Sequence, residues 1–154
     1  MRTSHELFRI EALIRTDLQE VLVTLIDLSL TGKHARWNVA GPDVRSIRLY
    51  LDEMVDVWRA AADAVGERIS VLGYFPDGRA QTVSGRRELA TLPEGPLAGR
   101  TVALLLETLL SDAVRIVRAK ANRIGAIDAI TADLFHSIVG TLEQQRRLMR
   151  APAS

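Results

Sequence analysis

The chain has 154 residues, of which 47% are hydrophobic and 25% charged, and its net charge of +1 is close to neutral. A chain of this length fits a single domain, residues 1–154, and can bury a substantial core; it has no cysteine for disulfides, thiolate metal sites or nucleophilic catalysis. Near-neutrality argues against a dedicated nucleic-acid binder, which usually carries a strong basic excess.

No segment has the pattern of a signal peptide or a membrane span. The N-terminal residues carry charges throughout, and the most apolar stretch, residues 102–110, is interrupted by Glu107 and is shorter than the ~20 residues that a spanning helix needs. The absence of cysteine suits a reducing compartment. We therefore expect a soluble, cytoplasmic protein that does not contact a membrane.

The first long helix is predicted from Ser4 to Leu30, because apolar residues recur there every seventh position, with others between them. Thr3 and Glu6 have the spacing of a capping box at its start. Glycine commonly stops helices, so Thr31–Gly32 is predicted to end it.

Three further helices follow the same kind of apolar spacing. They are predicted at about Pro42–Leu72, Gly99–Ile124 and Asp128–Arg150. A connection rich in proline and glycine, Tyr74–Ala98, separates the second helix from the third, and residues 84–90 could form a short helix within it. With no strand signal, this pattern predicts an all-α fold: a four-helix bundle with one long crossover between helices two and three.

The second helix carries a charged stripe, defined here as six residues three or four apart on one side of the helix: Arg48, Asp52, Asp56, Arg59, Asp63 and Glu67. An exposed face with ion pairs explains such a stripe. A site shared between two copies explains it too. Asp52 and Glu67 lie about 22 Å apart along the helix, too far to bind one metal ion, but an antiparallel copy crossing near residue 58 would put Arg48 and Asp52 opposite the other chain's Asp63 and Glu67.

Several motifs together resemble one known family. Residues 33–42, KHARWNVAGP, are similar to the pattern K-x-A-H-W-N-x-x-G-P of the Dps (DNA-protection-during-starvation) mini-ferritins. Leu51–Glu53, Asp63 with the following GERISVLG of residues 66–73, and Thr131–Phe135 also resemble that family. The resemblance implies a ferritin-like bundle with a short helix in the crossover, a hollow dodecameric shell, and an iron-oxidising centre at a two-fold interface.

The resemblance also assigns ligand positions, two of which depart from the family pattern. Asp52 of one subunit, with Asp63 and Glu67 of its neighbour, matches family ligands, whereas the two family histidines fall on Arg36 and Arg48. A guanidinium has no lone pair to offer a cation and keeps its positive charge. The two arginines add about the charge that a ferrous ion would bring, so we expect an ion-pair network with the carboxylates in place of the metal.

Other candidate ligands are interpreted as ordinary polar residues. His34 lies two positions from Arg36, and Asp133 and His136 have an i, i+3 spacing that can bind metal only with further ligands. Trp37 and Trp58 are expected to serve core or interface packing rather than redox chemistry.

Three functions follow from this sequence. The first is a Dps-like shell for iron handling and protection against oxidative stress, with a degenerate ferroxidase centre. The second is a working ferroxidase and iron-storage protein that uses Asp52, Asp63 and Glu67, and the third is a structural or DNA-compacting assembly without iron chemistry. DNA binding is expected to be weak and non-specific, because neither the N-terminus nor residues 150–154 form a basic tail, so nucleoid association would be loose. The basic clusters around residues 115–123 and 146–150 are interpreted as helix faces with ion pairs.

Overall fold

The structure is a computed structural model that describes residues 1–150, and most of these residues are helical. Its elements in chain order are α1 (Ser4–Asn38), β1 (Val39–Ala40), α2 (Val44–Val71), α3 (Ala80–Arg86), β2 (Leu97–Ala98), α4 (Gly99–Ile124) and α5 (Ala129–Arg150).

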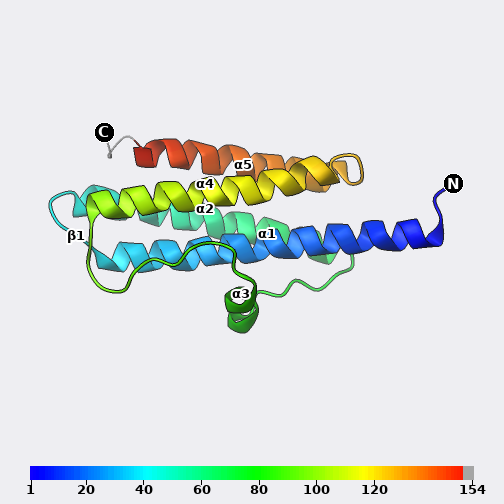
Figure 1. Ribbon diagram of the computed structural model, residues 1–154, viewed down its shortest axis with the longest axis horizontal. Helices are drawn as coiled ribbons and strands as arrows, with labels where there is room; N and C mark the ends of the chain where they lie inside the picture. Colours follow the sequence, from blue (N-terminus) through cyan, green and yellow to red (C-terminus); the bar gives the residue numbers. More distant parts are fainter. Residues whose placement is uncertain (151–154) are drawn as a thin grey trace.

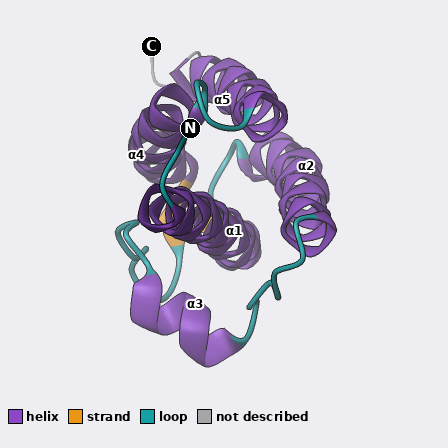
Figure 2. Cartoon of the chain, turned by 90° about the vertical axis from the view of Figure 1, so that its right-hand side faces the viewer, coloured by secondary structure: helices purple, strands orange, loops and turns teal. Residues whose placement is uncertain are grey.

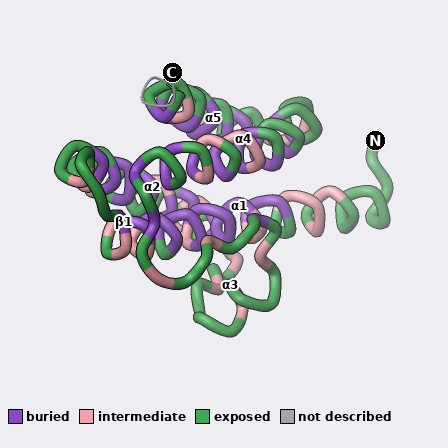
Figure 3. Tube along the Cα trace, turned by 60° about the vertical axis from the view of Figure 1, so that its left-hand side comes forward, coloured by how far each residue is buried: buried purple, intermediate pink, exposed green. Residues whose placement is uncertain are grey.

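The four long helices form two antiparallel pairs, α1 with α2 and α4 with α5 (Figures 1 and 2). A long crossover leaves the end of α2, forms α3 beside α1, and returns along α1 to the start of α4 (Figure 1). The predicted all-α bundle with a short helix in its crossover is therefore confirmed. The four long helices enclose a single core, while the first turns of α1 extend beyond it and are exposed (Figure 3).

Large apolar side chains from all four long helices fill the core. Leu25 of α1, Trp58 of α2, Leu110 of α4 and Phe135 of α5 are at most 1% exposed. Trp58 also donates a buried hydrogen bond from Nε1 to Oε1 of Gln145 on α5, at 2.7 Å. A buried indole N–H needs such an acceptor, so this bond fixes the tryptophan inside its own chain. Of the core and interface roles expected for Trp58, the core role is therefore confirmed.

The first helix is longer than its sequence pattern predicts. Its capping box is present as expected, since Thr3 Oγ1 accepts from the Glu6 amide at 3.2 Å and Glu6 Oε2 accepts from the Thr3 amide at 2.8 Å. Gly32, however, does not end the helix, which continues to Asn38. A Cβ atom at Gly32 would lie 2.7 Å from atoms of both Trp58 and Val55, so this glycine allows α1 and α2 to approach closely.

The crossover also differs from its prediction in detail. The short helix is α3, at Ala80–Arg86, rather than residues 84–90. Two-residue strands that the sequence did not signal, β1 and β2, pair in parallel, with Val39 opposite Leu97. The second helix ends as predicted: Gly73 follows it with a φ of 84°, in the left-handed region that favours glycine.

Candidate functional site

The last turns of α1 and the first half of α2 position the candidate site. Because α1 stays helical beyond Gly32, Lys33 and Arg36 lie three residues apart on one side of it. The parallel pair β1–β2 then fixes the short link from α1 to α2, and α2 begins at Val44 with Asp43 as its N-cap residue. Asp52, two turns into α2, faces the two basic side chains of α1.

Asp52 is held by two cations. Arg36 Nε donates to Asp52 Oδ1 at 2.7 Å, and Lys33 Nζ donates to the same oxygen at 3.3 Å. All three side chains are about one-third exposed, at 29% for Lys33, 33% for Arg36 and 38% for Asp52. The hydrogen bond from Arg36, with a further contribution from Lys33, lowers the pKa of Asp52 below its ordinary value.

Arg48 lacks such a partner. Its Nε atom is buried and has no hydrogen bond within residues 1–150. The predicted guanidinium–carboxylate contact is thus present at Arg36, whereas at Arg48 this chain alone supplies no acceptor for Nε. Lys33 was not predicted to join the site, although its i, i+3 spacing from Arg36 could have indicated it.

Asp63 and Glu67 lie farther along α2, and both are exposed. Neither forms an ion pair in the described part of the chain. They line an open hollow of about 470 Å³ between α1, α2 and the start of the crossover, together with apolar and small residues that include Leu22, Ile26 and Gly78. One chain therefore keeps Asp52 apart from Asp63 and Glu67, and across residues 1–150 no three His, Asp or Glu side chains are grouped to hold a metal ion.

The remaining candidate residues lie outside this group. His34 Nε2 is 2.9 Å from the carbonyl oxygen of Pro93, and Asn38 donates to the His34 carbonyl at 2.8 Å, so His34 attaches the crossover to the end of α1. Asp133 and His136 are exposed on α5. Trp37 is 69% exposed at the end of α1, which excludes it from this chain's core.

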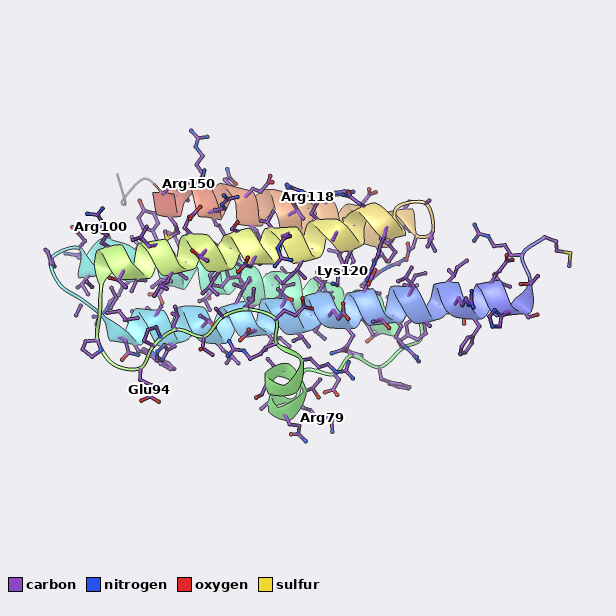
Figure 4. All side chains as sticks on the ribbon, in the orientation of Figure 1. Arg79, Glu94, Arg100, Arg118, Lys120 and Arg150 are labelled. Atoms are coloured by element: carbon purple, nitrogen blue, oxygen red, sulfur yellow. The ribbon has the colours of Figure 1, made fainter. Side chains whose placement is uncertain are left out.

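Most basic side chains of α4 and α5 are neutralised within the chain. Arg118 pairs with Glu143, Lys120 with Glu20 at 2.9 Å, and Arg150 with Glu107 at 2.9 Å; all three cations are labelled in Figure 4. Arg123 pairs with the fully buried Asp17, and Arg146 shares Glu107. The interpretation of the 115–123 and 146–150 clusters as ion-paired helix faces is confirmed. In the part of the chain that can be described, no helix is long and apolar enough to cross a membrane.

Comparison with known proteins agrees with this architecture. The family model for the ferritin-like domain matches residues 16–151. Among curated proteins, the chain is 31% identical to the fine tangled pili major subunit of Haemophilus ducreyi over 90% of this chain and 74% of that protein. It is also 31% identical to the DNA protection during starvation protein of Mycolicibacterium smegmatis, over 87% of this chain and 73% of that protein.

A solved structure gives the same result. Dps92 from Deinococcus radiodurans superposes with a TM-score of 0.91 at 26% identity, covering 93% of this chain and 87% of the other. The chain therefore belongs to the ferritin-like domain family and, within it, to the DNA-protection-during-starvation (Dps) proteins.

Proposed function

We propose that this chain forms a homo-oligomeric Dps-type shell, a dodecamer as the family resemblance implies, that protects against iron and oxidative damage. We further propose that its inter-subunit iron-oxidising position is degenerate. The observation that carries this proposal is the environment of Asp52, where Arg36 Nε and Lys33 Nζ both donate to Oδ1, at 2.7 and 3.3 Å. A cationic hydrogen-bond donor thus stands where the family pattern has a histidine ligand.

The donor set does not fit a ferrous ion as the substrate of this position. Histidine would offer a neutral nitrogen lone pair, whereas Arg36 and Arg48 offer only N–H donors with a permanent charge. An incoming cation would meet their repulsion and would have to displace Arg36 from Asp52. The hydrogen bond from Arg36, which lowers the pKa of Asp52, is the contact that iron would have to replace.

Iron oxidation kinetics test this proposal. The unmodified assembly should oxidise ferrous iron little faster than buffer does, and replacing Arg36→His together with Arg48→His should create a saturable fast phase. Each single replacement should do less, because one guanidinium remains. Arg147→His, on the exposed surface of α5, is the control and should change nothing. Fast, saturable oxidation by the unmodified protein that is abolished by Asp63→Ala would overturn the degenerate site.

A working oxidase is the second candidate, and one observation favours it. Asp63 and Glu67 are exposed and form no ion pair inside residues 1–150, so their oxygens are free to take a cation. In that case the carboxylates and water would supply the ligands, and the same Asp63→Ala variant would distinguish the two candidates.

A DNA-compacting role has less support. The arginines of α4 and α5 are largely neutralised by ion pairs, which lowers the number of phosphate counterions that binding could release. The expectation that no basic tail lies at residues 150–154 falls mostly outside the described residues, which end at Arg150. We expect only weak DNA retention, lost at moderate salt; a salt-resistant band shift with linear DNA would contradict this.

A further inference from the structure

We propose that Arg48 is an interface residue that binds Asp63 and Glu67 of a second copy of this chain. It thereby completes, without a metal ion, the charge cluster around Asp52. The inference rests on the proposed shell, in which two α2 helices meet across a two-fold axis. It specifies which residue of the partner each residue of the charged stripe faces.

Arg48 supplies the first observation. A guanidinium offers five N–H donors in a fixed arrangement that suits carboxylates, and it keeps its positive charge. The Arg48 guanidinium forms no hydrogen bond or ion pair in the chain as far as Arg150; its Nε is covered by this chain's own atoms, whereas its two Nη groups are not buried and can be reached by another molecule. By contrast, Arg68 pairs with Asp128 and Arg87 pairs with Asp27 of the same chain, each at 3.1 Å. The acceptor for Arg48 is therefore to be sought outside this chain.

The same helix displays the missing acceptors. Asp63 and Glu67 are exposed carboxylates with no ion pair in the described part of the molecule. They cannot serve their own Arg48, because fifteen and nineteen residues of helix separate them from it by about 22 and 28 Å. One chain thus carries an unsatisfied cation and unsatisfied anions on the same stripe, too far apart to meet.

A two-fold axis between two copies would bring these opposite charges together. If two α2 helices cross antiparallel near residue 57, Arg48 of each chain lies opposite the partner's Glu67, with the partner's Asp63 one turn away. The same operation places Asp56 of each chain opposite the partner's Arg59; both residues are exposed. The stripe is thus self-complementary at its two ends, Arg48 with Glu67, and in its middle, Asp56 with Arg59.

One pair of carboxylates in this arrangement is repulsive by itself. This repulsion explains why basic side chains gather around it. Asp52 falls opposite the partner's Asp63, so carboxylates from both chains converge there. Lys33, Arg36 and Arg48 bring three positive charges to Asp52 and the partner's Asp63 and Glu67, which bring three negative ones. The cluster is neutral without a bound cation.

Other occupants fit less well. A polyanion would be attracted by Arg48 but repelled by the five carboxylates of α2, against four arginines on that helix. A free cation would be attracted by Asp63 and Glu67 but would leave the accessible Nη groups of Arg48 without an acceptor. Only a second copy satisfies both ends of the stripe.

A charge-swap experiment tests the pairing directly. One variant carries Arg48→Glu, and the other carries Asp63→Lys with Glu67→Lys. Each should dissociate on its own, because like charges then meet at both equivalent sites, with at least a tenfold rise in the half-dissociation concentration, as expected for close charge pairs. An equimolar mixture should reassemble, since every site in a mixed pair joins opposite charges. Arg147→Glu is the matched charge reversal on α5 and should assemble normally.

The assembly is measured by sedimentation and native mass spectrometry in the presence of a chelator. Because the chelator removes iron, the outcome of the iron-oxidation experiment does not affect this measurement. The charge-swap test therefore remains valid even if the degenerate-site proposal fails. If a charge-reversal variant loses its helical circular dichroism signal, two neutral variants are used instead: Arg48→Met, and Asp63→Asn combined with Glu67→Gln. Each neutral variant should then weaken assembly and the mixture should recover partly, because one of its two sites is intact. Unchanged assembly of the single variants, or no recovery on mixing, would overturn the proposal.

Discussion

Two arginines near opposite ends of α2 have opposite surroundings. Arg68, in the last turn, donates from Nη2 to both carboxylate oxygens of Asp128 at 3.1 Å and from Nε to Thr131 at 3.0 Å, joining α2 to the start of α5. Arg48, near the first turn, has a buried Nε without a partner in residues 1–150. The difference separates charges that hold the fold together from charges that are available to another molecule.

The Arg68 end is fully satisfied within the chain. Its ion pair is only 17% and 12% exposed. Burial opposes ionisation of Asp128, but hydrogen bonds from Thr131 and Arg68 outweigh it and lower the carboxyl's pKa. This contact stabilises the isolated chain, because both of its partners lie in that chain.

Replacing each arginine with methionine tests whether Arg68 stabilises the isolated chain and Arg48 does not. Arg68→Met should destabilise the dissociated chain by about 2–3 kcal/mol, somewhat less than the 3–5 typical of fully buried pairs, because it strands Asp128. Arg48→Met is its matched control and should not destabilise the dissociated chain, because it removes a buried donor, Nε, that has no acceptor there. Urea unfolding followed by circular dichroism measures both; equal losses would show that Arg48 also serves the isolated fold.

The apolar contact between α1 and α2 gives a smaller expected loss of stability, with a closely matched glycine control. Gly32→Ala should destabilise by about 1–2 kcal/mol, because a new Cβ would lie 2.7 Å from Trp58 and Val55 in a packed contact. Gly140→Ala on α5 is the control, with nothing within 4 Å of its added Cβ. It should stabilise by up to about 1 kcal/mol through helix propensity. Thermal unfolding of the two variants distinguishes them, and a stabilising Gly32→Ala would contradict the close approach of the helices.

The smallest effect concerns protonation of Asp52. Its pKa in the folded chain is lowered chiefly by the bond from Arg36, so the contact is complete above the ordinary aspartate pKa of about 3.9 and is lost as pH falls through the lowered value. Carboxyl-carbon NMR should find the Asp52 midpoint below the ordinary value, and Arg36→Ala should raise it. An unshifted midpoint in the unmodified protein would mean that Arg36 does not hold this carboxylate in solution.

Sequence pattern was sufficient for the main architecture, because apolar spacing over long stretches leaves few alternatives to a four-helix bundle with one crossover. It failed at Gly32, since a glycine that stops a helix and one that admits a neighbouring helix look the same in sequence. The two-residue strands β1 and β2 were too short to produce any period. Around the site, the Arg36–Asp52 contact followed from the motif, whereas the unsatisfied Nε of Arg48 depends on packing between helices and could not be read from residue order.

We propose that Arg36 occupies the Asp52 carboxylate, where iron would otherwise bind. Crystals of the assembled protein soaked in ferrous iron, with anomalous scattering recorded at the iron edge, test it most directly. We predict no iron peak beside Asp52 in the unmodified protein, and a peak there once Arg36→His and Arg48→His are combined. Iron bound to Asp52 of the unmodified protein, with Arg36 displaced from its carboxylate, would contradict it.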